Sequence, residues 1–191
     1  MKFSSILILG SISLFLLSCS APKFVTSLEA YPKIGLNLNA EIIIIEDLRK
    51  DVSYGDIKLP FISYSGQNNI IIPPLKSDYE KLIKETILEN LNSSSSNSSI
   101  ITIQILNASK EFFATFWSEK ETSYVELKII VEIDEKEIVI TESGEYSKKS
   151  IDATKSSSEK IYQNALKEVT YKGLRKLKNQ ISDDNQKQHN S

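Results

Sequence analysis

A two-residue alternation between branched apolar and polar side chains restricts the fold of this chain more than any other feature. Residues 101–105 alternate isoleucine with threonine and glutamine. Successive side chains of a strand point to opposite faces of a sheet, so the pattern predicts a strand over about 100–108 with one buried face. The alternation returns in residues 125–133 and 138–146, on either side of the polar reversal 134–136. These two segments therefore predict a hairpin of two further strands.

A run of four consecutive isoleucines, residues 42–45, predicts a strand of another kind. Branched side chains favour extended backbone, and an unbroken apolar run is typical of a strand that is buried on both faces. Residues 50–74 are rich in Gly, Pro and Asn and predict a long loop with an irregular hairpin or edge strand. If helices cover only one face of the sheet, the isoleucine run needs a second cover. This loop, a second copy of the chain and a partner protein are the three candidates.

Two amphipathic segments predict helices. Residues 78–91 carry apolar side chains at helical spacing. Ser77 and Glu80 match a capping box, in which both side chains satisfy free amides at a helix start. A second, longer apolar stripe runs from residue 161 to residue 181. Gly173 lies inside that stripe, where glycine costs about 1 kcal/mol relative to alanine, and it predicts a close approach of the helix to the sheet.

The resulting order of elements is strand, helix, three strands, helix. Both helices then bury their stripes on one face of an antiparallel or mixed sheet of about four strands, as a two-layer α+β sandwich. A chain of 191 residues with 40% hydrophobic residues suits one core, so we expect a single domain over residues 40–181. Residues 182–191 are polar throughout and predict a disordered tail.

The N-terminus is typical of a secretory signal. Lys2 precedes an apolar stretch of about 15 residues, which rises roughly 22 Å as a helix and is shorter than the ~30 Å hydrocarbon core of a membrane. The end of the stretch resembles the lipobox of bacterial lipoproteins and consists of Leu16, Leu17, Ser18 and Cys19. The resemblance implies that residues 1–18 are removed as a signal peptide and that Cys19 is lipidated. Residues 19–39 then predict a lipidated tether.

The composition excludes several kinds of chemistry. One cysteine allows no internal disulfide and no thiolate zinc cage, and the one histidine, His189, lies in the predicted tail. The formal net charge of -2 lacks the basic surplus of a nucleic-acid-binding protein. Among sequence motifs of catalysis, only numerous carboxylates are present, which leaves a paired-carboxylate hydrolase as the enzymatic alternative. We therefore expect no enzyme, no cofactor, no metal and no nucleic-acid partner.

A short charged motif follows the isoleucine run. Asp47 and Arg49 point the same way on an extended chain and predict a structural brace for the following loop through charge-assisted hydrogen bonds; a role in binding is the alternative. Together with Gly55 and the lipobox, Asp47-Leu48-Arg49 resembles the YajG-like family of bacterial lipoproteins. That resemblance implies no known catalytic activity. The layout is also similar to LptE, the lipoprotein that plugs the lipopolysaccharide translocon, and to lipoprotein subunits of lipid-transport ABC systems.

Two surface features predict contacts. Four large aromatic residues precede the hairpin and predict a contact site for a partner protein or a lipid, with an extension of the core as the alternative: Phe112, Phe113, Phe116 and Trp117. The last helix carries many lysines, which suit an anionic lipid surface or, alternatively, form an ordinary solvated face near a helix C-terminus.

Together these patterns predict a lipid-anchored, non-enzymatic binding or assembly module of the bacterial cell envelope. Ser20, where an Asp would retain a lipoprotein in the inner membrane of enterobacteria, implies an outer-membrane location facing the periplasm. Its expected partners are the membrane, through the N-terminal lipid, and an envelope protein or further copies of itself. The alternative is an accessory lipoprotein of lipid or lipopolysaccharide transport, like LptE or an auxiliary subunit of an ABC transporter.

Overall fold

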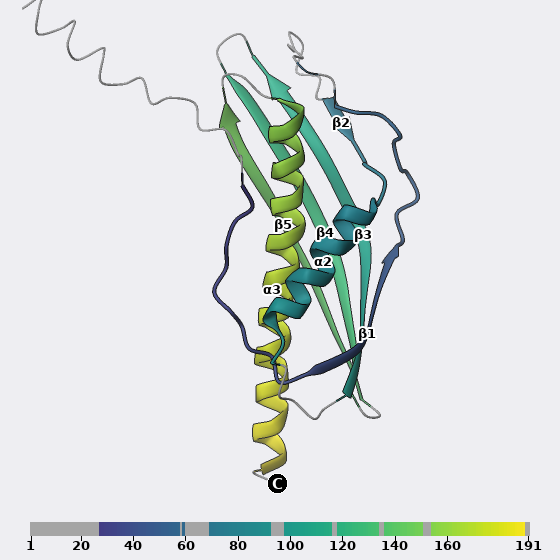
Figure 1. The fold of residues 1–191 in the computed structure, drawn as a ribbon, viewed down its shortest axis with the longest axis vertical. Helices are drawn as coiled ribbons and strands as arrows, with labels where there is room; N and C mark the ends of the chain where they lie inside the picture. Colours follow the sequence, from purple (N-terminus) through teal and green to yellow (C-terminus); the bar gives the residue numbers. More distant parts are fainter. Residues whose placement is uncertain are drawn as a thin grey trace, which may run out of the picture.

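The computed structural model describes residues 27–57, 59, 69–92, 98–115, 118–133, 136–150 and 154–189. Several residues singled out above lie outside the described residues: Leu16, Leu17, Ser18, Cys19, Phe116 and Trp117. The described part forms a single body in which two helices lie against one sheet (Figure 1).

The sheet is mixed and contains one strand more than the four expected. Its strands are β1 (Asn39–Asp47), β2 (Asn69–Ile71), β3 (Ser98–Ala114), β4 (Glu119–Ile133) and β5 (Lys136–Ser150). Their order is β1-β3-β4-β5, and β2 also pairs with β3. β1 runs parallel to β3, whereas every other pair is antiparallel. The predicted hairpin is β4 and β5, and the short edge strand expected within residues 50–74 is β2.

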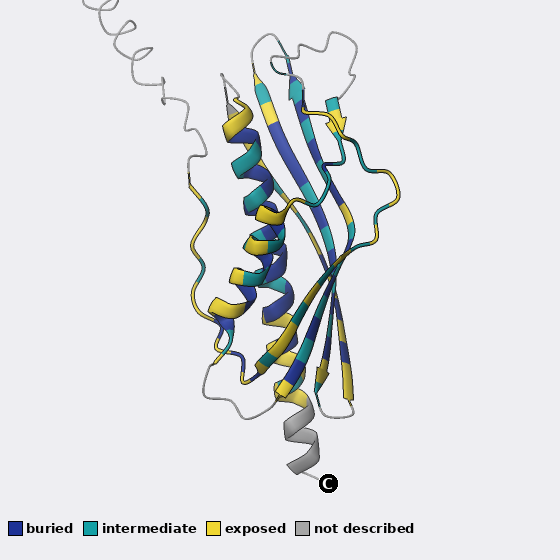
Figure 2. Ribbon diagram, turned by 45° about the vertical axis from the view of Figure 1, so that its right-hand side comes forward, coloured by how far each residue is buried: buried dark blue, intermediate teal, exposed yellow. Residues whose placement is uncertain are grey.

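Both helices cover the same face of the sheet, so the predicted two-layer α+β sandwich is confirmed (Figures 1 and 2). The helix α3 (Lys155–His189) lies along β4 and β5, and α2 (Ser77–Asn90) packs mainly against α3. The apolar alternation of β3 and β4 points toward these helices and is fully buried there. The core therefore lies between the helices and one face of the sheet.

A β-bulge divides β3 into two halves. The register shifts between Ile105 and Asn107, so the buried side chains lie at odd positions before the bulge and at even positions after it. β1 pairs with the first half as far as Ile105. β2 pairs with the second half, opposite residues 110–112. One long strand thus supports two different neighbours along the same edge.

The expected burial of β1 on both faces is wrong. Ile43 and Ile45 pack against the core, but Ile42 is 50% exposed and Ile44 is 40% exposed. β1 lies at the edge of the sheet, and no described element covers its outer face. In the loop that was one candidate cover, Ile57 instead packs on the helix side. A run of branched residues therefore specifies extended backbone here without specifying burial.

The packed domain begins before Ala40, inside the predicted tether. Residues 27–38, which we call the N-terminal strap, lie along α3 and bury Ile34, Leu36 and Leu38. Asn164 accepts a hydrogen bond from the Glu29 amide at 2.7 Å and donates one to the Ser27 carbonyl at 3.3 Å. The tether expectation missed the strap because Pro and Gly interrupt its apolar residues, so they show no sustained period.

Tyr31 of the strap stacks on Tyr171 of α3, with 4.7 Å between the ring centres. Farther along, the Ile34 carbonyl accepts a hydrogen bond from Lys178 Nζ at 2.6 Å. The strap therefore follows the same direction as α3, from its first half to its second.

Two local expectations about the helices need correction. The capping box is wrong, because α2 has Lys76 as its N-cap and no side chain caps it; the Tyr79 and Glu80 amides bond the Lys76 carbonyl instead. The disordered tail is wrong over residues 182–189, which continue α3. After Gly173 the chain has no glycine or proline before its end, so a helix already anchored by its core continues through polar residues.

Gly173 confirms the predicted close approach to the sheet. A Cβ atom at this position would lie 2.5 Å from Ile129 Cδ1 and 3.6 Å from Glu142 Cβ. Only glycine lets α3 lie this near to β4 and β5.

Candidate functional site

Asp47 and Arg49 form a bidentate ion pair at the bulge of β3. Arg49 donates from Nε to Asp47 Oδ1 at 2.7 Å and from Nη2 to Oδ2 at 2.6 Å. Arg49 Nη1 also donates to the Ala108 carbonyl at 3.2 Å, just beyond the bulge. The Arg49 side chain is only 3% exposed. The pair therefore holds the chain where it leaves β1, as a brace would, and it is not open to a ligand.

The electrostatics of the pair agree with this geometry. Burial opposes the ionisation of Asp47, but the hydrogen bonds from Arg49 outweigh it and hold the pKa of the carboxyl below its usual value. Both groups therefore stay charged near neutral pH.

The two described aromatic residues of the predicted contact site lie within β3, not in a loop. Phe112 is fully buried on the helix side, where it packs with Ile57 and Ala114. Phe113 points to the opposite face and is half-buried. The expected contact role is therefore wrong for Phe112, which belongs to a small second core. The bulge decides this, because it moves even-numbered positions of β3 to the helix side.

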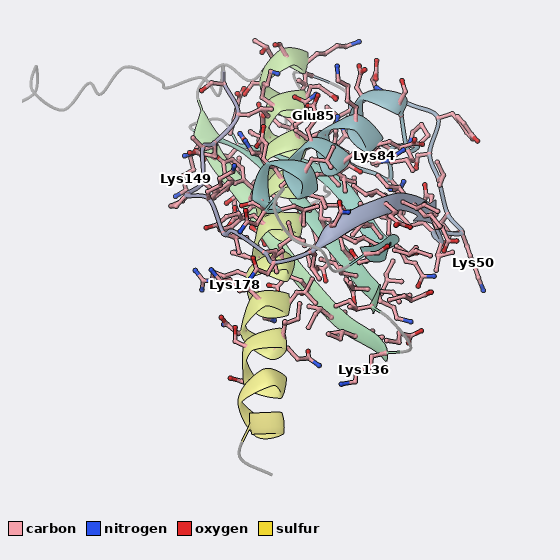
Figure 3. All side chains as sticks on the ribbon, turned by 60° about the horizontal axis from the view of Figure 1, so that its bottom comes forward. Lys50, Lys84, Glu85, Lys136, Lys149 and Lys178 are labelled. Carbon is pink, nitrogen blue, oxygen red and sulfur yellow. The ribbon has the colours of Figure 1, made fainter. Side chains whose placement is uncertain are left out.

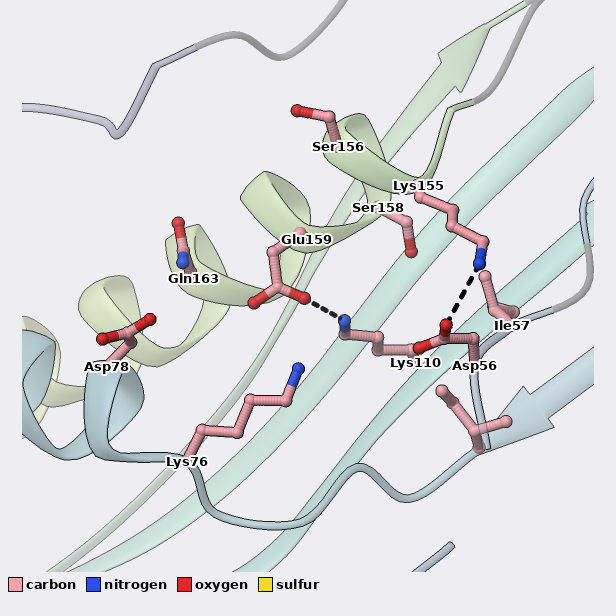
Figure 4. A pocket seen from close by; sticks show the side chains of 11 residues that line it. Asp56, Ile57, Lys76, Asp78, Lys110, Lys155, Ser156, Ser158, Glu159 and Gln163 are labelled. Carbon is pink, nitrogen blue, oxygen red and sulfur yellow. Dashed lines mark hydrogen bonds and ion pairs between the residues drawn. The ribbon is translucent and has the colours of Figure 1, made fainter. Parts of the chain in front are cut away.

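A pocket of about 400 Å³ lies where the first turns of α2 and α3 meet the second half of β3 (Figure 4). Its floor holds an ion pair between Lys110 Nζ and Glu159 Oε2 at 2.6 Å. Lys110 also lies 5.1 Å from the ring centre of Tyr162. Nearer the rim, Lys155 pairs with Asp56 at 3.1 Å. Figure 4 shows both pairs together with Lys76, which extends into the pocket from the start of α2.

The pocket is balanced in charge. Three lysines and three carboxylates line it: Lys76, Lys110, Lys155, Asp56, Asp78 and Glu159. Burial opposes the ionisation of Glu159, but the hydrogen bond from Lys110 and the positive charges of Lys110 and Lys76 together outweigh it and hold the pKa of the carboxyl below its usual value. Two of the lysines are already paired, so the pocket does not concentrate positive charge for an anionic ligand.

Sequence reasoning missed the ion pair of Lys110 with Glu159 and the buried carboxyl of Glu121. Lys110 and Glu121 lie beyond the ends predicted for their strands, on the core-facing positions of β3 and β4. A charged residue that continues the apolar side of an alternation is the signal that would have located Glu121. For Lys110 that signal is hidden by the bulge, which changes the parity of the buried positions.

Glu121 is 2% exposed and accepts a hydrogen bond from Ser157 Oγ at 3.3 Å, under the first turn of α3. Its Oε1 has no hydrogen-bond partner among the residues that the structure describes. Burial raises the pKa of Glu121 to about 7, and the charge of Glu119 adds to the rise. This carboxyl is closed off from solvent and belongs to the fold rather than to an open site.

The outer face of the sheet, opposite the helices, carries the most exposed apolar side chains of the strands β1 and β5. Ile42 and Ile44 are joined there by Val139, which is 39% exposed. Ile100 and Ile130 lie half-buried between them. Figure 2 shows the strands of this face free of any helix. Grouped apolar residues on an otherwise polar surface are typical of an interaction site.

The lysines of α3 are largely engaged within the molecule. Lys172 pairs with Glu168 at 2.6 Å, and Lys176 pairs with Glu142 of β5. Lys178, labelled in Figure 3, lies beside the strap whose carbonyl it bonds. These contacts favour an ordinary solvated helix face over a surface reserved for anionic lipid.

Within the described ranges, no helix is long and apolar enough to cross a membrane. The same ranges contain no group of three or more His, Cys, Asp or Glu residues that could hold a metal ion. Comparison with known proteins yields no match, either to a protein-family model or to a curated protein.

Proposed function

We propose that this protein is a lipid-anchored, non-enzymatic binding or assembly module of the bacterial cell envelope, which faces the periplasm from the outer membrane. The lipobox at residues 16–19 supports the anchor. The observation that carries the binding role is the open outer face, where Ile42, Ile44 and Val139 are exposed although both helices pack on the opposite face of the sheet.

The arrangement of charges supports a binding role over catalysis. The braced pair Asp47–Arg49 and the pair Lys110–Glu159 each satisfy their own charges. Glu121 is closed off beneath α3. A general acid or base must reach a substrate atom within hydrogen-bond distance, whereas Glu121 is buried and the carboxyls of Asp47 and Glu159 are already paired with cations.

The lipid-transport alternative gains no support from the described residues. Phe112 is in the core, and the pocket lined by lysines is balanced by carboxylates. This role stays a prediction from the sequence.

The anchor is tested by labelling the full chain in bacteria with a palmitate analogue. We expect the native protein to carry the label and to run at the size of a chain that lacks residues 1–18. Cys19→Ser removes the sulfur to which the lipid is attached, so we expect it to lose the label completely.

Ser20→Ala is the matched control, since it changes the neighbouring residue but keeps the thiol, and it should remain labelled. A Cys19→Ser protein that keeps the label, or a native chain that never acquires it, would contradict the proposed anchor.

A further inference from the structure

We propose that the outer face of the sheet binds a second copy of this chain, in a symmetric dimer whose two-fold axis runs across the strands. This inference rests on the proposed lipid-anchored module, because the anchor constrains which side of the dimer faces a membrane. Three observations favour a second copy as the binding partner: the register of the strands, the charges on this face and the position of the strap.

The register arranges the outer face in three rows that cross the strands. The central row consists of Ile44, Thr102, Ile130 and Val139. One flanking row consists of Ile42, Ile100, Glu132 and Glu137. The other flanking row consists of Glu46, Gln104, Lys128 and Thr141.

The central row complements itself. A two-fold axis along it places each of its residues opposite the same residue of the partner, as a symmetric interface requires. Ile44 and Val139, exposed at 40% and 39%, then contact apolar side chains instead of water. The two sheets pack face to face with nearly aligned strands, which is an ordinary arrangement of β-sheets.

The flanking rows carry opposite charges at their β4 positions, Lys128 and Glu132. The same axis exchanges them while it keeps each strand opposite its own copy, so Lys128 of β4 faces the partner's Glu132. Within one chain Glu132 is a direct cross-strand neighbour of Glu137, and like charges in that position repel. Neither carboxylate, nor Lys128, forms an ion pair with any residue that the structure describes. In the dimer, Lys128 of each copy faces Glu132 of the other copy, so two such ion pairs form.

The strap is compatible with this axis. It lies beside α3 on the β5 side of the sheet, where Tyr146 donates a hydrogen bond to Glu29 at 2.7 Å (Figure 1). An axis that runs across the strands leaves the β5 edges of both copies on one side of the dimer. Both straps therefore begin on that side, and both lipid anchors can enter one membrane.

The dimer is tested by thiol crosslinking of the full chain in bacterial membranes. Val139→Cys places a thiol next to its own copy, so a short bifunctional thiol reagent should produce a species of twice the monomer mass. Leu88→Cys is the matched control, because Leu88 is equally apolar and 56% exposed but lies on α2, away from the outer face. The native chain, treated alike, should not crosslink if Cys19 is lipidated.

These outcomes separate the two proposals. A double-mass species from Val139→Cys alone supports the dimer. Its absence, its equal appearance with Leu88→Cys, or a product of another mass from a different protein overturns it, whereas palmitate labelling at Cys19 is unaffected. Crosslinking of the native chain through Cys19 would instead contradict the anchor.

Exchanging the charges of Lys128 and Glu132 in the Val139→Cys variant tests whether these two residues face each other in the dimer. Lys128→Glu replaces two attractive pairs per dimer by repulsive ones, so we expect the crosslinked fraction to fall about fivefold. Adding Glu132→Lys restores both pairs in the opposite sense and should restore the fraction. Resistance to proteolysis reports that each variant is folded. Folded variants that show no fall, or no recovery, overturn this arrangement of the two copies.

Discussion

Glu121 is a buried carboxyl whose protonation bears on the stability of the whole sheet. It lies on the core side of β4 beneath Ser157, and burial raises its pKa to about 7. In an unfolded chain the same carboxyl titrates near its ordinary value, so between the two values the folded chain holds a proton that the unfolded chain has lost. Stability therefore falls as the pH rises from about 4.5 through 7.

We predict that Glu121→Gln removes this pH dependence. The amide stays neutral, so the variant should exceed the native protein in free energy of unfolding by about 3 kcal/mol at pH 8 and differ little near pH 4.5. Urea unfolding at the two pH values measures the difference. Glu89→Gln, at an exposed position of α2, should behave like the native protein. Equal pH dependence in the Glu121→Gln variant and the native chain would refute the prediction.

Gly173 lies where the sequence predicted a close approach of the last helix to the sheet, and the structure has that approach. We predict that Gly173→Ala lowers the free energy of unfolding by up to about 2 kcal/mol. Alanine favours the helix by about 1 kcal/mol, but its Cβ collides with Ile129 inside the closed core, and such overpacking costs about 1–3 kcal/mol.

Gly55→Ala is the matched control for this change. No atom lies within 4 Å of the position of a Cβ at Gly55, so its free energy of unfolding should stay the same or rise slightly. Chemical denaturation of the two variants decides the matter, and a stabilised Gly173→Ala protein would show that α3 moves away without cost.

Among the elements, the last turn of α2 holds the strap together with α3. Asn90 is buried there, and its Oδ1 accepts a hydrogen bond from the Ile34 amide at 2.9 Å while its Nδ2 donates to the Thr86 carbonyl at 2.7 Å. Two backbone bonds, from Leu36 N to the Asn90 carbonyl and from Asn92 N to the Leu36 carbonyl, complete the attachment. The strap is therefore part of the helical layer rather than a free linker.

We predict that Asn90→Ala lowers the free energy of unfolding by about 1–3 kcal/mol, since it leaves the buried Ile34 amide without a partner. Hydrogen exchange should show faster exchange of the Ile34 amide than in the native protein. Asn37→Ala removes only an exposed bond to Asn92 and should change the free energy by less than about 0.5 kcal/mol. Unchanged protection of Ile34 in Asn90→Ala would mean that the backbone bonds alone hold the strap.

At the scale of the whole molecule, the fold has one covered and one open face. The helices cover most of the inner face of the sheet, and the strap packs beside α3. The outer face has a mainly apolar central row between two rows that each carry charged side chains. An anchor on the β5 side would hold this open face upright beside the membrane, where it is free to meet another copy.

Much of this architecture follows from local patterns. The two-residue alternation specifies the strands at residues 101–105 and 125–133, and the apolar stripes specify the two helices. Gly173, a glycine inside a helix, indicates where the last helix approaches the sheet closely. These features depend on the backbone period and on side-chain size, which a single sequence displays. The amino-acid sequence also shows a single cysteine and a single histidine, and it predicts a lipobox ahead of the domain.

The buried side of the second half of β3, and the exposure of β1, depend on tertiary packing and could not be predicted from the sequence. The bulge in β3 reverses the parity of its buried positions, so Lys110 and Phe112 face the helices. The edge position of β1 leaves Ile42 and Ile44 exposed, although their branched sequence matches that of a central strand. Burial depends on what lies opposite a side chain, and here those neighbours come from distant parts of the chain.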